Sequence, residues 1–140
     1  MRLLPIPIRH CMSSRSFTKL YALAEAGETT ALLAHIAELS GEFPDERDPA
    51  SWALIRAAEA NQIDTARALI ENGANIEGAS ERSHIRPLWK AAKRGHLQMV
   101  KLLVESGADR SATDNDRMTA LGYAKRYSRT EVIQYLESFG

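Results

Sequence analysis

The most constraining feature of this sequence is an internal repeat with a period of about 34 residues. Residues 52–75 align with residues 86–109 after a shift of 34, and residues 18–36 and 119–136 join the same register after shifts of 34 and 33. The strongest matches are Leu54 with Leu88, Ala57-Ala58 with Ala91-Ala92, Leu69 with Leu103, and Gly73-Ala74 with Gly107-Ala108. A unit this small cannot bury its own apolar face, so the chain must stack its repeats.

Each repeat predicts two short helices closed by a turn, because its apolar residues recur at helical spacing. Pro87 suits the first position of a helix, and the hydroxyls of Thr18 and Thr119 can cap a helix N-terminus. Arg86 and Trp52 stand at the equivalent position and cannot cap in this way. Helices of about ten residues are marginal in water by themselves, so neighbouring repeats must hold them.

Small residues set the spacing and the ends of these helices. The alanine pairs allow two helices to approach closely, and Gly73 and Gly107 are expected to end the second helix in a left-handed conformation. In the first repeat Leu39 stands where this glycine would be, so its second helix is expected to run on toward Gly41. In the last repeat Glu137 replaces the apolar Val104, which gives the polar outer face that a terminal repeat needs.

This pattern resembles the ankyrin repeat, whose period is about 33 residues and whose signature begins Thr-Pro-Leu-His. The corresponding positions here are Thr18-Lys19-Leu20-Tyr21, Trp52-Ala53-Leu54-Ile55, Arg86-Pro87-Leu88-Trp89 and Thr119-Ala120-Leu121-Gly122. The resemblance implies an all-α repeat solenoid of stacked helix-turn-helix units with short β-turn fingers. We expect a single domain over residues 17–140, with units at about 17–46, 47–80, 81–113 and 114–140.

Two segments depart from the repeat pattern. Residues 42–51, EFPDERDPAS, are rich in proline and acid and predict an ordered loop or finger instead of a helix. Residues 1–16 carry arginines and serines without acids, and two prolines interrupt their apolar run. They are open to three interpretations: a targeting peptide, a flexible tail, or an apolar strand that covers the first repeat. Met12 could also be the true start.

Composition excludes several classes of protein. No run approaches the roughly 18 apolar residues of a membrane span. The single cysteine, Cys11, cannot form an internal disulfide, and no Asn-x-Ser/Thr acceptor occurs. We therefore expect a cytoplasmic protein without a membrane contact, most simply a monomer.

The sequence offers no catalytic constellation. It contains no Gly-x-Gly-x-x-Gly, phosphate-binding loop, His-Glu-x-x-His or Cys-x-x-Cys motif. Its four histidines are scattered over different segments, and His96 at the family's Gly-His position favours a structural hydrogen bond over metal ligation. We expect no enzyme activity, no cofactor and no metal.

A net charge of zero conceals two oppositely charged halves. Residues 17–80 carry 4 Lys and Arg against 11 Asp and Glu, whereas residues 81–129 carry 11 against 5. The resemblance implies that the fingers and the exposed positions of each first helix form one concave surface. In the third and fourth units these positions give the candidate partner-binding residues Arg82, Ile85, Lys90, Lys93, Arg94, Met118, Tyr123, Arg126 and Tyr127. The surface also includes Asn115 of the fourth unit and, in the first two units, Phe17, Glu25, Ala26, Ser51, Arg56, Glu59 and Ala60.

The leading hypothesis is a non-catalytic module that binds a partner protein with an acidic or mixed-charge surface through repeats 3 and 4. A nucleic-acid contact through the same basic residues is one alternative, although the pI near 6.9 counts against it. Weak self-association of the acidic half with the basic half is another. The lysines and arginines could also be merely solvated, and Tyr123 or Tyr127 could pack on the final helix. For Trp89 we favour packing over binding.

Overall fold

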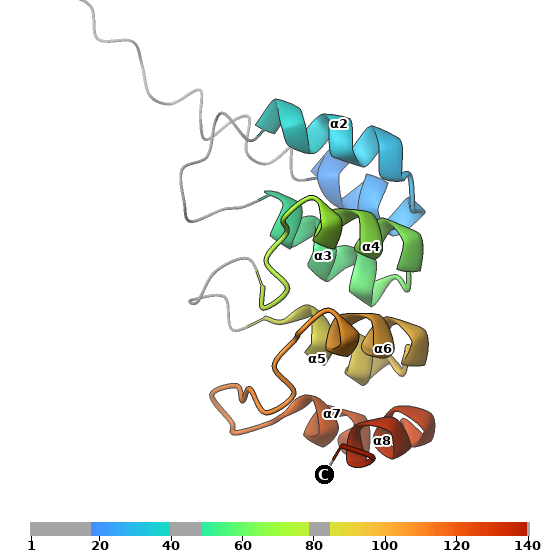
Figure 1. Ribbon diagram of the computed structural model, residues 1–140, viewed down its shortest axis with the longest axis vertical. Coiled ribbons are helices and arrows are strands. Elements are labelled where there is room, and N and C mark those ends of the chain that lie inside the picture. Colours follow the sequence, from blue (N-terminus) through green and yellow to red (C-terminus); the bar gives the residue numbers. More distant parts are fainter. Residues whose placement is uncertain (1–17, 40–48, 79–84, 140) are drawn as a thin grey trace, which may run out of the picture.

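The computed structural model describes residues 18–39, 49–78 and 85–139, and the helices in these ranges form four successive helix-turn-helix pairs (Figure 1). No strand is assigned within these ranges. The predicted all-α repeat solenoid is therefore confirmed. The pairs are residues 18–26 with α2 (Thr29–Leu39), α3 (Pro49–Glu59) with α4 (Ile63–Glu71), α5 (Pro87–Arg94) with α6 (Leu97–Glu105), and α7 (Ala120–Arg126) with α8 (Thr130–Glu137).

The helices stack in two columns that run along the long axis of the molecule (Figure 1). The first helices of successive repeats contact one another, α3 with α5 and α5 with α7, and the second helices do the same, α2 with α4, α4 with α6 and α6 with α8. The first helices are the more deeply buried, since each of the central ones lies between two neighbours and its own second helix. The second helices bury a single stripe, such as Met99, Val100 and Leu103 in α6.

Alanine makes this close stacking of the first helices possible. Ala57, Ala58, Ala91, Ala92 and Ala124 are all fully buried. A side chain without atoms beyond Cβ lets two helix backbones approach, and any larger residue at these positions would overpack the core. The repeated Ala-Ala pairs therefore mark, in the sequence, the positions where the first helices pack closely.

Every first helix ends in the same left-handed turn. One or two positions after the helix, each repeat has a residue with a positive φ: Gly27, Asn61, Gly95 and Ser128, with φ between 57° and 78°. Around Gly95 the backbone N–H of Gly95 bonds to the carbonyl of Ala92 and the N–H of His96 to that of Ala91, which is the Schellman pattern. Gly73 and Gly107 also have positive φ, which confirms their predicted role at the ends of the second helices.

In repeats 2 to 4 the side chain that follows this turn forms a hydrogen bond with a backbone carbonyl of the preceding repeat, a contact that we call a clamp. Gln62 Nε2 donates to the carbonyl of Glu25 at 2.8 Å, His96 Nε2 bonds to that of Glu59 at 3.0 Å, and Arg129 Nε donates to that of Lys93 at 3.0 Å. The three side chains and the three carbonyls each recur at the repeat period. Because a carbonyl only accepts, His96 carries its proton on Nε2. The structural hydrogen bond expected for His96 is thus present.

One local prediction is wrong. The chain from Pro49 to Ser51 was expected to be loop, yet α3 begins at Pro49, which suits the first turn of a helix because it lacks an N–H. Ser51 was expected on the exposed surface, but it is fully buried and its Oγ accepts the backbone N–H of Asn75 at 2.8 Å. The rest of that segment, residues 42–48, lies outside the described residues, as do residues 1–16 and Phe17. The predicted cap at Thr119 is confirmed, because its Oγ1 accepts the N–H of Gly122 at 3.1 Å.

The left-handed turns predict opposite results for one substitution at two glycines. Gly95→Ala forces a Cβ into a residue with φ of 78° and within 2.7 Å of Arg129 Cδ, so we expect a loss of about 1–2 kcal/mol in the free energy of unfolding. Gly122 lies inside α7, and an added Cβ meets the flexible end of Met118 at 3.4 Å and Thr119 Oγ1 at 3.6 Å, which are ordinary contact distances. Gly122→Ala should therefore gain about 0.5–1 kcal/mol. Urea denaturation of both variants measures the difference, and equal effects would contradict this account of the turn.

Candidate functional site

Glu59 lies at the centre of an ionic network that joins the second repeat to the third. Its carboxylate is 3.2 Å from Arg56 Nη1, 3.1 Å from Arg94 Nη2 and 3.7 Å from Lys90 Nζ. Arg56 also reaches Glu25 of the first repeat at 3.5 Å, and its guanidinium lies 4.7 Å from the centroid of the Tyr21 ring. The network thus runs along the exposed side of the first helices, which we call the first-helix face.

The positive charges around Glu59 affect its pKa more strongly than its burial does. Burial by itself raises the pKa of Glu59, but the hydrogen bond from Arg94 and the charges of Lys90 and Arg56 together lower that pKa below its usual value. Glu59 therefore stays ionised at neutral pH. It follows that Lys90 and Arg94, two of the predicted binding residues, are already paired with a carboxylate of the neighbouring repeat.

The basic end of the first-helix face begins at Lys93. Its Nζ lies 5.2 Å from the centroid of the Tyr127 ring, and no carboxylate pairs with it among the described residues. Tyr127 is 39% exposed and Arg126 beside it is exposed as well. By register, Lys93 and Arg126 occupy the positions that Glu25 and Glu59 hold in the first two repeats. The face therefore changes sign from the second repeat to the third.

A pocket of about 140 Å³ opens on this face between α5 and α7. Four of its lining residues were predicted from the sequence: Ile85, Lys90, Lys93 and Tyr123. The other two are Arg86 and Trp89, and the rings of Trp89 and Tyr123 stand with centroids 6.0 Å apart. The pocket thus combines an apolar, aromatic wall with three cationic side chains.

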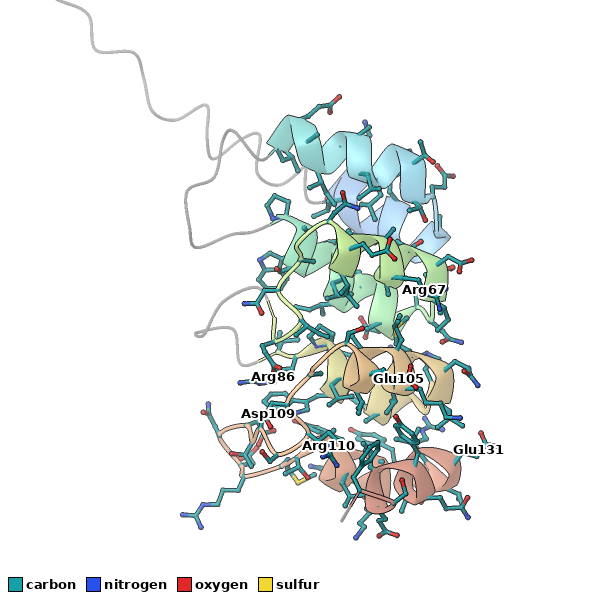
Figure 2. The ribbon with its side chains drawn as sticks, in the orientation of Figure 1. Arg67, Arg86, Glu105, Asp109, Arg110 and Glu131 are labelled. Carbon is teal, nitrogen blue, oxygen red and sulfur yellow. The ribbon has the colours of Figure 1, made fainter. Side chains whose placement is uncertain are left out.

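The finger after the second repeat is braced against the third. A carboxylate oxygen of Glu77 contacts Arg86 Nη1, while its other oxygen accepts the backbone N–H of Asp109 at 2.7 Å. Figure 2 shows Arg86 and Asp109 toward the edge from which the fingers project, away from Glu131 in the first turn of α8 at the opposite edge. The Arg86 guanidinium also lies 5.5 Å from the centroid of the Trp89 ring. These contacts fix one wall of the pocket.

The finger before α7 is held by Asp114. Its Oδ1 accepts the backbone N–H groups of Asp116 and Met118, both at 2.9 Å, and its Oδ2 accepts the hydroxyl of Tyr123. Arg117 turns the chain with a φ of 59°. Tyr123 is consequently half-buried, with its hydroxyl occupied, and Met118 lies beside Gly122 in the first turn of α7.

The structure therefore brings together some of the predicted binding residues and separates others. Ile85, Lys90, Lys93 and Tyr123 share the pocket, and Tyr127 adjoins it through Lys93. Arg94 points to the second repeat, Met118 lies in the last finger, and Arg126 is exposed at the end of α7. Arg82 lies outside the described residues.

Sequence reasoning missed Arg86 as a lining residue and the roles of three other residues that shape the site. Trp89 was assigned to packing and is 5% exposed, yet it also lines the pocket. Glu59 was placed on the face, but its role as the partner of Lys90 and Arg94 was not foreseen. The repeat register could have revealed it, since residue 59 aligns with residue 93. Asp114 carried no signal, because its role depends on the path of the finger.

The described residues contain no helix long and apolar enough to cross a membrane. In the same part of the chain no group of three or more His, Cys, Asp and Glu side chains is placed to hold a metal ion.

The pair formed by Asp114 and Tyr123 predicts a specific titration. The hydrogen bond to Asp114, then burial, then the Asp114 charge raise the pKa of Tyr123 to about 12. Since the folded pKa of Tyr123 exceeds the ordinary value of 10.0, protonated Tyr123 contributes its full stabilisation below pH 10 while Asp114 is ionised, and this contribution is lost as the pH rises through about 12. Asp114→Asn should lower the pKa of Tyr123 toward 10.0, whereas Asp116→Asn removes the same charge nearby and should change it little. NMR titration of labelled tyrosine measures both values, and equal shifts would refute the pairing.

The comparisons agree with this architecture. A family model described as ankyrin repeats, in three copies, matches residues 54–138. Over 86 residues the chain is 38% identical to XBAT34 of Arabidopsis thaliana, which is named as an E3 ubiquitin-protein ligase. It is 39% identical over 64 residues to human ankyrin repeat domain-containing protein 49, and 38% identical over 65 residues to 26S proteasome non-ATPase regulatory subunit 10 of Dictyostelium discoideum.

These alignments cover 61%, 46% and 46% of this chain and 23%, 26% and 26% of the three relatives, so the chain spans about a quarter of their length. The matched segment contains α5 to α8 and most of the second repeat, while the pair formed by residues 18–26 and α2 precedes it. Ankyrin repeats are non-catalytic units that bind other proteins. With its repeat register, its stacked helix pairs and this match, the chain belongs to the ankyrin repeat family.

Proposed function

We propose that this protein binds a partner protein through the first-helix face of repeats 3 and 4, without catalysis, and that the partner presents an acidic or mixed-charge surface. The observation that carries the proposal is the pocket between α5 and α7, which gathers four independently predicted residues at the point where the face becomes basic. Aromatic rings and arginine, which this pocket contains, are enriched at the centres of protein interfaces.

The distribution of paired and unpaired charge narrows the binding region. Lys90 and Arg94 share the single negative charge of Glu59, so each is only partly neutralised. Lys93 and Arg126 have no carboxylate partner among the described residues. The attraction of an acidic partner therefore centres on the ends of α5 and α7, and such charges act mainly on the rate of association.

The same arrangement weighs against nucleic acid. A phosphate backbone needs a continuous basic surface, and its affinity grows with the number of phosphates that are neutralised. Here Glu59, Glu77 and Asp114 surround the pocket within the array of cations. Self-association would instead place the acidic part of the first-helix face of one copy on the basic end of another. The proposal is that the protein is a monomer and that it is cytoplasmic.

A charge reversal on the first-helix face tests the proposal. Lys93→Glu with Arg126→Glu should abolish retention of a partner from an extract of the source cells, because it inverts the charge at the ends of α5 and α7. The measurement is affinity capture followed by mass spectrometry, with sedimentation of the chain alone to detect self-association.

The matched control reverses two cations on the second helices, Arg67→Glu with Lys101→Glu. Arg67 is exposed on α4, where Figure 2 shows it, and Lys101 contacts a tyrosine ring in the same way as Lys93 does. The control should retain the partner. Equal retention by both pairs would overturn the assignment of the face.

A further inference from the structure

One residue of the pocket lining carries a buried polar group without a hydrogen-bond partner. Trp89 is 5% exposed, its indole Nε1 is buried, and no described residue accepts a hydrogen bond from it. A buried donor without an acceptor is costly, and native structures contain few of them. At a site lined by other binding residues, such a donor indicates that the acceptor comes from a ligand.

The charge of the lining identifies the kind of acceptor. Three of the six lining residues are cations, Arg86, Lys90 and Lys93, and no carboxylate belongs to the lining. Glu77 contacts Arg86 and Glu59 lies 3.7 Å from Lys90, but Lys93 meets only the Tyr127 ring among the described residues. An anionic oxygen is the acceptor that both the indole N–H and the free ammonium of Lys93 would satisfy.

The size and the apolar wall identify the form of the ligand. A volume of about 140 Å³ is well below the roughly 300–1,000 Å³ of small-molecule sites, so the pocket suits one side chain. Ile85, Trp89 and Tyr123 provide a surface for methylene groups, which a glutamate or aspartate has and an inorganic anion lacks. Nε1 itself is buried, so this occupant requires a rotation of the indole ring that turns its N–H toward the pocket.

We propose that this pocket binds a glutamate or aspartate side chain of a partner peptide, whose carboxylate accepts from Trp89 Nε1 and pairs with Lys93 while its methylenes lie against Ile85 and Tyr123. The proposal rests on the proposed function and specifies the partner's chemistry: an acidic peptide segment. The apolar stem and the carboxylate together explain why the site is both aromatic and cationic.

A displayed library of random linear peptides, selected on the full chain, tests the proposal. The retained peptides should share one acidic residue, and replacing it in a synthetic peptide by its amide, Gln or Asn, should weaken binding about tenfold, because a charge-assisted pair is lost. Binding of the acidic peptide should move the indole N–H resonance of Trp89 downfield in NMR spectra and leave that of Trp52 in place.

Two variants make the assignment specific. Lys93→Met and Trp89→Phe should each weaken the acidic peptide about tenfold, whereas Lys101→Met on the second-helix side should leave its affinity unchanged. Because Trp89 is buried, thermal unfolding of Trp89→Phe establishes whether the variant is folded. The indole resonance of the unaltered chain reports the contact between Trp89 and the peptide without a substitution.

The outcomes separate the two proposals. The retained peptides could lack a shared acidic residue and still lose their binding in the variant with the pair Lys93→Glu and Arg126→Glu. This outcome would support binding at the first-helix face and overturn the proposal of an acidic side chain in the pocket. Retained peptides that this pair leaves bound would overturn both. Retention of no peptide, tighter binding of a random single-stranded oligonucleotide, or an unmoved Trp89 resonance with a bound acidic peptide would each overturn the pocket's assignment.

Discussion

The packing of successive first helices against one another is the constraint on which the structure depends. Helices of this length are marginal alone, and the fully buried alanines of α3, α5 and α7 bring their backbones close enough to be held. The clamps from Gln62, His96 and Arg129 then fix each repeat on the one before it by bonding to a backbone carbonyl. Since the acceptor is main chain, the donor can differ from repeat to repeat without changing the geometry.

Charge has a double role along the first-helix face. Around Glu59, ion pairs to Arg56, Lys90 and Arg94 join the second repeat to the third. The lowered pKa of Glu59 keeps its carboxylate ionised at neutral pH. Exposed pairs of this kind contribute little to stability individually. Their main effect is to leave Lys93 and Arg126 as the cations that face outward beyond the junction.

The repeat register made most of the fold predictable, because period, alanine pairs and turn glycines all specify the same stacked helices. It failed at Ser51, where the proline- and acid-rich composition of residues 42–51 predicted loop and hid the early start of α3. The site was predictable in part. Register placed Ile85, Lys90, Lys93 and Tyr123 on one face, but it could not show that Asp114 occupies the Tyr123 hydroxyl or that the Trp89 indole lacks an acceptor. Those facts depend on finger paths and ring orientations, which vary between repeats.

The pocket's position across the last junction of the array couples occupancy to local order. Tyr123 comes from α7, whereas the remaining lining residues come from α5 and the finger before it. In a linear array each repeat is held by its neighbours, so one repeat can open locally at its junction with the next. Detachment of α7 and α8 would remove Tyr123 and leave the site open on one side. A bound ligand would contact both sides of this junction and stabilise the docked state of α7 and α8. Amide hydrogen exchange that depends on their detachment would then become slower.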